Sequence, residues 1–425
     1  MKKLDIRETT KPRKNVLIGA LFLICIVHAF GETAPDVLNA WQFGTAEFDG
    51  ATALTVDTGG NIIVAGFTKG SLSGASAGIS DAFVRKYDPK GNELWTRQFG
   101  TAESDGATAL AVDPGGNIIV AGYTGGNLFG SSAGKNDAFV RKYDPKGTEL
   151  WRRQFGSAES DLAAALAVDA EGNILVAGST EGRLSGSYAG NEDIFVRKYN
   201  SKGNELWTRQ FGSAEYDFAK ALAVDAGGNI LVAGITWGNL AGSSAGDYDA
   251  FVLKYDSKGT MLWTRQFGTA KYDDATALAV DAGGNIIVAG PTMGNLSGSS
   301  AGNSDLFVRK YDPKGTVLWT RRFGTIEFDD AKALAVDTGG NIIVAGDTGG
   351  NISDSSITNY DAFVRKYDFK GSVLWMRQFG TAEDDYTTAI AVDAGSNIMV
   401  AGYTSGSLFG DSAGDADAFV MIYKP

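Results

Sequence analysis

The chain has 425 residues, of which 44% are apolar and 21% are charged, and its formal net charge is −12. This length exceeds what one compact core usually holds, so we expect either several domains or a repeat architecture that grows by addition. The acidic balance disfavours nucleic acid and anionic lipid as partners.

The first 31 residues differ from the rest and predict an export signal. MKKLDIRETTKPRK carries six Lys and Arg against two acidic residues, and NVLIGALFLICIVHAF is an apolar stretch of signal-peptide length. Ala29 and Gly31 supply the small residues that a signal peptidase requires, so we predict cleavage after Gly31. The alternative is an uncleaved anchor, the one way in which we expect the protein to meet a membrane. Both predict a secreted, periplasmic or cell-surface protein.

Cleavage would remove the only Cys and the only His, Cys25 and His28. The net charge of residues 32–425 is −16, because the first 31 residues hold six of the 38 basic residues and two of the 50 acidic ones. Without thiol or imidazole, the mature chain has no Ser-His-Asp or Cys-His catalytic site and no His- or Cys-ligated zinc site.

Residues 34–425 form seven periods of 56 residues without an insertion. The period is seen in three series: Phe43, Phe99, Phe155, Phe211, Phe267, Phe323 and Phe379; Asp57, Asp113, Asp169, Asp225, Asp281, Asp337 and Asp393; and Asp81, Asp137, Asp193, Asp249, Asp305, Asp361 and Asp417. A fixed period near 50 indicates a solenoid or a propeller.

One period, residues 100–156, shows what each unit contains. ATALAVD, NIIVAGYT, DAFVRKYD and TELWRRQFG are four strand patterns, and no segment has helical periodicity. VDPGGN and YDPKGT predict tight hairpins, because Asp and Pro start a turn that Gly completes. The sequence therefore predicts one all-β domain, residues 32–425, folded as a seven-bladed β-propeller of four-stranded antiparallel blades.

The seventh unit ends at DAFVMIYKP, before its fourth strand. VLNAWQFG, residues 37–44, has the pattern of that missing strand but precedes the first unit. We predict that it pairs with DAFVMIYKP and closes the ring. Trp41 replaces the usual Arg, and Met421 and Ile422 replace the usual Arg-Lys pair, so an apolar seam is expected at the closure.

The units DAFVRKYDPKGNELWTRQFGT, ATALAVD and GGNIIVAGYT resemble the SBBP β-propeller repeat family of bacteria and archaea. The resemblance extends over essentially all of residues 32–425. It implies the propeller fold and an exported or surface-displayed protein. It implies no catalytic residue, because the repeat motif contains none that can be matched.

Carboxylates recur in the link that leads to each innermost strand. The series is Glu47/Asp49, Glu103/Asp105, Glu159/Asp161, Glu215/Asp217, Glu327/Asp329 and Glu383/Asp385, with Lys271/Asp273 as the exception. A catalytic pair rarely comes in six copies, so we predict that each Asp caps the inner strand or pairs with a recurrent Arg. A ring of carboxylates that binds cations, or a glycosidase pair, is the alternative.

No cofactor is predicted, with one exception to be tested. Asp411, Asp415 and Asp417 in GDSAGDAD could provide an oxygen-rich Ca²⁺ site. The competing interpretation is that Asp and Gly simply favour loops.

The two longer links of each unit vary between copies, and in a four-stranded blade they emerge on the same face of the ring. Binding groups often lie on loops that a rigid frame holds, and aromatic residues are good anchors for sugars or proteins. The candidate ligand-binding residues are Trp237, Tyr123, Tyr403, Phe67, Tyr248, Tyr360, Phe129 and Phe409. The alternative is drift in tolerant loops, with the aromatic rings folded back over the blades.

We therefore predict a monomeric, non-catalytic binding or scaffolding module that recognises a surface glycan or an extracellular protein through this face. A purely structural surface or matrix protein is the second hypothesis. A carboxylate-dependent glycan hydrolase or lyase is the third, and the missing His and the even repetition of carboxylates count against it.

Overall fold

The computed structural model describes residues 35–130, 133–186, 188–242, 244–298, 302–352 and 359–425. The predicted signal segment, residues 1–31, lies outside them, so signal cleavage stays a prediction. The described residues form 28 strands. Among these residues we find no helix long and apolar enough to cross a membrane.

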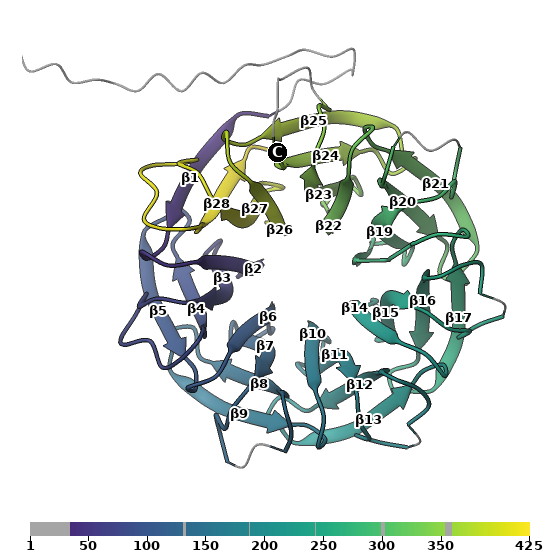
Figure 1. Cartoon of the computed structure of the whole chain (residues 1–425), viewed down its shortest axis with the longest axis horizontal. Coiled ribbons are helices and arrows are strands. Elements are labelled where there is room, and N and C mark those ends of the chain that lie inside the picture. The colour runs from purple at the N-terminus through teal and green to yellow at the C-terminus, as the bar shows by residue number, and fades with distance from the viewer. Residues whose placement is uncertain (1–34, 131–132, 187, 243, 299–301, 353–358) are drawn as a thin grey trace, which may run out of the picture.

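The strands form seven four-stranded antiparallel sheets, which stand as blades around a central opening (Figure 1). The predicted seven-bladed propeller is confirmed. We number the blades 1 to 7 by their innermost strands, which line the opening: β2 (Asp49–Val56), β6 (Asp105–Val112), β10 (Asp161–Val168), β14 (Asp217–Val224), β18 (Ala277–Val280), β22 (Asp329–Val336) and β26 (Asp385–Val392).

Three further strands complete each blade. The second strands are β3 (Ile62–Thr68), β7 (Ile118–Thr124), β11 (Ile174–Thr180), β15 (Ile230–Thr236), β19 (Ile286–Thr292), β23 (Ile342–Thr348) and β27 (Ile398–Thr404). The third are β4 (Asp81–Tyr87), β8 (Asp137–Tyr143), β12 (Asp193–Tyr199), β16 (Asp249–Tyr255), β20 (Asp305–Tyr311), β24 (Asp361–Tyr367) and β28 (Asp417–Tyr423). The outer are β5 (Glu93–Phe99), β9 (Glu149–Phe155), β13 (Glu205–Phe211), β17 (Met261–Phe267), β21 (Val317–Phe323), β25 (Val373–Phe379) and β1 (Val37–Phe43).

The hydrophobic core lies between the blades. In one cluster, Ile63 and Val84 of blade 1 pack against Ile118 and Phe139 of blade 2. The second and third strands are buried along nearly their whole length, because each blade packs on a neighbour with both faces. Their sequences are accordingly almost continuous apolar runs.

The ring is closed by strand β1, which pairs with β28 as predicted (Figure 1). Phe43 lies opposite Ala418, the same register in which Phe99 lies opposite Ala82 in blade 1. Trp41 packs edge-on against Tyr87, with ring centroids 4.9 Å apart. Ile422 is buried at the same seam, whereas Met421 is buried on the other face of β28, against blade 6. The predicted apolar closure is thus confirmed.

The end of the ring that carries the two tight turns of each blade, here called the hairpin rim, has the same contacts in blade after blade. In blade 2, Asp113 accepts hydrogen bonds from the N–H groups of Gly115 and Asn117, both at 2.9 Å. Lys142 pairs with Asp113 at 2.7 Å and donates to the carbonyl of Ser201 in blade 3 at 3.1 Å. These contacts therefore both close the turn and hold neighbouring blades together.

Blade 5 departs from the common pattern because β18 has only four residues, where the other inner strands have eight. Pro291 explains the difference. It follows Gly290 where other blades have a residue with an N–H, so one rung of the ladder between β18 and β19 cannot form. The chain of Asp274 and Ala275 is held instead by longer bonds to the carbonyls of Pro291 and Gly234, at 3.2 and 3.4 Å.

Candidate functional site

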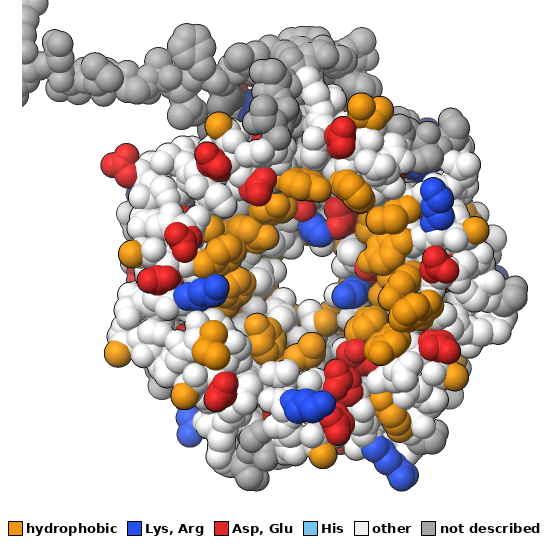
Figure 2. Space-filling model, in the orientation of Figure 1, with side chains coloured by type: hydrophobic (Ala, Val, Ile, Leu, Met, Phe, Trp, Pro, Cys, Tyr) orange, Lys and Arg blue, Asp and Glu red, His pale blue; other side chains and the backbone are white. Residues whose placement is uncertain are grey.

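The variable positions of the repeat meet at the other end of the ring, here called the loop rim. The link between blades and the long loop of each blade come together there, because the N–H of Asp105 bonds to the carbonyl of Ser80 at 2.9 Å and the N–H of Gly125 bonds to that of Ser104 at 2.8 Å. The two longer links therefore share one face, as predicted. Figure 2 shows hydrophobic side chains gathered around the central opening and basic side chains in its wall.

The loop rim is anchored by two buried aspartates at each blade junction. Asp81 accepts hydrogen bonds from the N–H of Ala77 at 2.9 Å and from the amide of Gln98 at 2.8 Å. Asp105 accepts bonds from the N–H and the hydroxyl of Thr101, at 2.6 and 2.8 Å. Burial raises the pKa of Asp105, against the opposing hydrogen bonds from Thr124 and Thr101. Each Asp of the recurrent Glu/Asp series thus caps its link, as predicted, while Glu103 is exposed.

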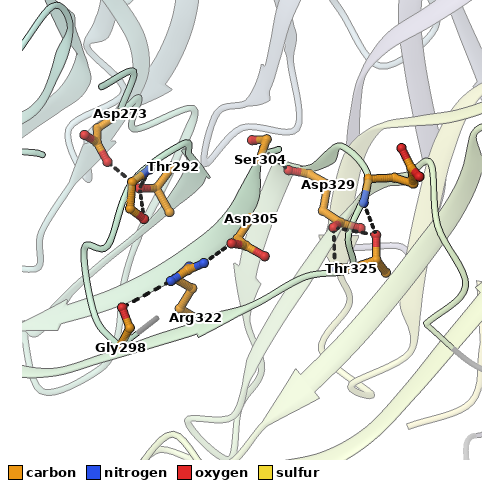
Figure 3. Close-up of polar contacts among 10 residues, drawn as sticks. Asp273, Thr292, Gly298, Ser304, Asp305, Arg322, Thr325 and Asp329 are labelled. Carbon is orange, nitrogen blue, oxygen red and sulfur yellow. Dashed lines mark hydrogen bonds and ion pairs between the residues drawn. The ribbon is translucent and has the colours of Figure 1, made fainter. Parts of the chain in front are cut away.

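One junction uses a different side chain, as Figure 3 shows. Arg322 stands where the other blades have Gln, and its guanidinium pairs with Asp305 and donates to the carbonyl of Gly298 at 3.4 Å. Next to it, Asp329 accepts bonds from Thr325, as in the other blades. The anchoring scheme therefore tolerates a change of charge without a change of fold.

A first group of rings crosses blades 4 and 5, and we call it the first aromatic arc: Tyr216, Trp237, Tyr248 and Tyr272. Trp237 stacks on Tyr248 with centroids 4.7 Å apart and lies 5.4 Å from Tyr216, while Tyr248 lies 5.5 Å from Tyr272. Trp237 is still 41% exposed. The rings thus support one another and leave part of the indole open to solvent.

A second group crosses blades 6, 7 and 1, and we call it the second aromatic arc: Phe48, Phe67, Tyr360, Tyr386 and Tyr403. Successive centroids are 5.7 Å apart for Tyr360 and Tyr386, 5.0 Å for Tyr386 and Tyr403, 5.3 Å for Tyr403 and Phe48, and 5.4 Å for Phe48 and Phe67. A hollow of about 250 Å³ lies beside it, lined by Tyr360, Phe328, Glu327, Gly349, Asn359 and Asp384.

Between the two arcs lies a group that we call the charged cluster: Lys220, Asp274, Asp330, Lys332 and Asp347. Lys332 pairs with Asp330, and its ammonium lies 4.0 Å from Asp347. Asp347 also accepts a bond from the N–H of Thr387 at 2.9 Å. Asp274 accepts a bond from the hydroxyl of Tyr272 at 3.1 Å, which connects the cluster to the first arc.

Burial controls the protonation of this cluster. It raises the pKa of Asp347 to about 8, although Lys332 opposes the shift, so this carboxyl keeps its proton at neutral pH. It raises the pKa of Asp274 to about 6, although Lys220 opposes it. For Lys332 burial acts in the other direction, but Asp330 and Asp347 outweigh it and raise the pKa of the ammonium.

The two lysines of the cluster occupy a bulge in the inner strand. Lys332 has no partner in the ladder between β22 and β23, and Lys220 has none in the ladder between β14 and β15. In blade 1 the bulged residue is Thr52, whose hydroxyl donates to the carbonyl of Ala107 in blade 2 at 2.7 Å. Bulges re-aim side chains next to functional sites. In blades 4 and 6 this position holds a lysine instead of a threonine that bonds to the next blade.

Not all of the predicted ligand-binding residues join these groups. Five do: Trp237 and Tyr248 in the first arc, and Phe67, Tyr360 and Tyr403 in the second. Phe129 lies under Arg152, 4.8 Å from its guanidinium, and Phe409 packs 6.1 Å from Phe419. Both rings therefore fold back over their own blades.

Tyr123 and the proposed calcium ligands also lie apart from the arcs. Tyr123 is partly buried in blade 2 and packs on the backbone of Gly106. Asp417 is buried and accepts bonds from Gln42 and Ala413, at 2.8 and 2.7 Å, whereas Asp411 and Asp415 are exposed. In the described ranges no three acidic, His or Cys side chains are placed to hold a metal ion. The three loop aspartates therefore do not form the ligand group that we considered.

Sequence comparison identifies the repeat. The profile of the SBBP beta-propeller repeat matches residues 94–130, 150–184, 206–241 and 374–410. These four segments are SBBP repeats. The resemblance seen in the sequence is therefore confirmed for these four segments, which lie within a closed seven-bladed ring.

Two curated relatives match most of the chain. The regulatory protein FlaEY of Caulobacter vibrioides is 26% identical over 417 residues, which cover 87% of this chain and 43% of FlaEY. The uncharacterized WD repeat-containing protein L264 of Acanthamoeba polyphaga mimivirus is 22% identical over 504 residues, which cover 87% of this chain and 36% of L264. The chain thus spans less than half the length of either relative.

A solved structure supports the fold. The WD40 β-propeller domain of Doa1 superposes with a TM-score of 0.52 at 12% identity, covering 90% of this chain and 96% of that domain. At this identity the likeness concerns the fold alone. None of these three proteins is named as an enzyme.

Proposed function

We propose that this protein is a non-catalytic recognition module that binds a macromolecular partner, a glycan or a protein, through its loop rim. The observation that carries the proposal is the contrast between a repeated scaffold and one varied face. The anchoring aspartates recur in every blade, while the positions beside them hold aromatic, acidic, basic and small residues. Rigid frames with varied loops are typical of binding proteins.

The two aromatic arcs give this face the properties of a binding surface. Trp and Tyr dominate the energy of many interfaces, because they bury a large area at a low cost in side-chain entropy. Trp237, Tyr216 and Phe328 are each at least 36% exposed. Contacts with neighbouring rings hold Trp237 and Tyr216 in place, so little entropy is lost when a partner covers them.

We also propose that the protein acts outside the cytoplasm, on the basis of its N-terminal basic and apolar segments. The acidic surface suits an exported protein that stays soluble. Mass spectrometry of the N-terminus of the protein from its native cells would test this. A chain that begins at Glu32 in the exported fraction is expected, and an intact N-terminus in the cytoplasmic fraction would contradict it.

The binding proposal is tested with Trp237→Ala in a glycan array and in a pull-down from the native cell surface. The matched control is Phe369→Ala, because Phe369 is 54% exposed but lies at the hairpin rim. We expect Trp237→Ala to lose at least tenfold in affinity for the recovered partner and Phe369→Ala to bind like the parent. If both variants bind as the parent does, the loop rim is not the binding face. If no partner is recovered by either method, the protein is a structural component instead.

A further inference from the structure

The charged cluster breaks the symmetry of the ring. The residue after the recurrent capping Asp is Asp274 in blade 5 and Asp330 in blade 6. The other blades have Gly50, Gly106, Leu162, Phe218 and Tyr386 there. Two residues later the bulge holds Lys220 and Lys332, where the other blades have Thr or Ala. A sevenfold scaffold does not require these five charges, so their concentration on blades 4 to 6 calls for another explanation.

The cluster has hydrogen-bonding capacity that its own residues do not use. Asp274 is only 3% exposed, and among the described residues its Oδ1 atom has no hydrogen-bond partner. The Oδ1 atom of Asp330 is also buried and has no hydrogen-bond partner within the described part of the chain. Leaving a buried carboxylate oxygen unpaired is costly. Both carboxyl groups lie near the cations of the cluster, since Lys332 pairs with the Oδ2 atom of Asp330 and the charges of Lys220 and Lys332 oppose the rise in the pKa of Asp274.

The mixture of charges limits the chemistry of a ligand. A cation would meet Lys220 and Lys332, and an anion would meet three carboxyl groups. A hydroxyl avoids both conflicts, because it donates a hydrogen bond to a carboxylate and accepts one from an ammonium. Two adjacent hydroxyls would satisfy an Asp and a Lys together. A polyhydroxylated ligand therefore fits the cluster better than an ion does.

The surroundings of the cluster favour a ring-shaped ligand. The first aromatic arc reaches it through Tyr272, whose hydroxyl bonds to Asp274. The second arc reaches it through Tyr386, which precedes Thr387, the donor to Asp347. The apolar face of a pyranose packs well on such rings, while its hydroxyls point to the polar groups between them.

We propose that the charged cluster is a carbohydrate-binding subsite at the mouth of the central opening. Neighbouring hydroxyls of one sugar residue bond to Asp274, Asp330, Lys220 and Lys332, and the flanking sugars pack on the aromatic arcs. This proposal rests on the proposed binding function of the loop rim. It names the class of partner and the residues that select it.

The test is an array of neutral and acidic oligosaccharides, followed by calorimetric titration of the full chain with the strongest binder. Asp330→Asn and Lys220→Ala are the test variants, and Lys135→Ala is the matched control, because Lys135 is an exposed lysine of the same rim on blade 2. Asp330→Asn keeps the shape of the side chain, and Lys220 is exposed, so both variants should fold. Thermal melts of all three check this.

We expect each test variant to bind at least tenfold more weakly and the control to stay within twofold of the parent. Test variants that bind like the parent, while Trp237→Ala does not, would leave the binding face intact but overturn the subsite. A silent array together with a protein partner lost in Trp237→Ala would overturn the carbohydrate assignment and keep the proposed function. Preferential binding of poly-L-lysine would show that the cluster recognises cations, and would also overturn the subsite.

Discussion

The two rims of the propeller are built from the same blades but carry different kinds of sequence. At the hairpin rim, a Lys–Asp pair recurs in blades 1 to 6 with distances of 2.7 to 2.9 Å. At the loop rim, the residues beside the buried anchors differ in almost every blade. The hairpin rim joins each blade to the next, so its chemistry is repeated. The loop rim needs only its two anchoring aspartates, and the remaining positions are free to serve another purpose.

Blade 7 shows what happens when the repeated chemistry is absent. Ile422 occupies the position of the recurrent Lys, and Trp41 occupies that of the recurrent Arg. Packing of Trp41 on Tyr87 replaces the hydrogen bond that Arg97 donates to Gly147 at 2.9 Å in blade 1. Polar clamps and apolar packing are thus interchangeable at the hairpin rim, provided that no charge is left buried alone.

The largest effect is expected from deleting residues 32–44, which include β1. Blade 7 would keep three strands, and the packing of Trp41 and Phe43 would be lost. Each large apolar side chain contributes about 1.5–3 kcal/mol when fully buried, and the seam between blades 7 and 1 would open. We expect a loss of about 5 kcal/mol or more in the free energy of unfolding, measured by calorimetry. Phe43→Ala is the milder companion, and an unchanged melting temperature in the deletion would contradict the closure.

A second large effect is expected at the hairpin rim from Lys142→Ile, which copies the residue of blade 7. Burial would raise the pKa of Asp113, but hydrogen bonds from Lys142 and Asn117 outweigh it and hold that pKa below its usual value. Without Lys142, the buried carboxylate lacks its cation, which costs about 3–5 kcal/mol. Chemical denaturation measures this loss.

The double variant Lys142→Ile with Asp113→Asn is the control for this prediction. Asn still accepts the turn hydrogen bonds, and no unpaired charge remains, so most of the stability should return. A double variant as unstable as the single one would show that Lys142 acts through packing and not through its charge.

At the loop rim, Asp347→Asn should change the pH dependence of stability. The pKa of Asp347 is about 8 in the folded chain against an ordinary value of 3.8, so the folded state holds a proton that the unfolded state releases. The free energy of unfolding of the parent therefore falls as pH rises from about 4 to 8. We expect the Asn variant to match the parent near pH 4 and to exceed it by a few kcal/mol at pH 9. A difference in melting temperature between the variant and the parent that stays constant over this pH range would contradict the raised pKa.

The fold could be predicted almost completely from the sequence, because each feature that defines it is repeated. The period places the strands, the Asp-Pro and Gly-Gly turns join them, and the QFG register of residues 42–44 indicates the closure. The short strand β18 was not foreseen, although Pro291 stands in a strand where its missing N–H breaks the ladder. The proline alone is therefore enough to indicate this local exception from the sequence.

The site could be predicted only in outline. Variation between copies identified the loop rim and five of the arc residues. It did not separate Trp237 from Phe129, because whether a loop ring turns toward the opening or back over its blade depends on tertiary contacts such as that with Arg152. Asp274, Asp330, Lys220 and Lys332 were missed, since the two repeat positions that they occupy lie inside a strand pattern. The bulge that re-aims the two lysines becomes apparent only in the paired strands.

The smallest effect is expected from Arg322→Gln, which gives the odd junction the side chain of the other six. A Gln at this place does two things: in blade 2, Gln154 donates to Asp137 at 2.7 Å and accepts from the N–H groups of Leu128 and Phe129. A guanidinium has no acceptor, so Arg322 fulfils only the first role, although its pairing with Asp305 is charged and buried. We expect the gain and the loss nearly to cancel, with a change within about 1 kcal/mol in chemical denaturation.

The reverse exchange, Gln154→Arg, sharpens this comparison. It would leave the N–H groups of Leu128 and Phe129 without their acceptor, and we expect a loss of about 1–2 kcal/mol. If Arg322→Gln proves clearly more damaging than Gln154→Arg, the ion pair stabilises its junction by more than the loop bonds do. The anchors of the loop rim would then differ between blades in strength as well as in chemistry. Variation between blades would thus include the buried anchoring contacts beneath the aromatic arcs.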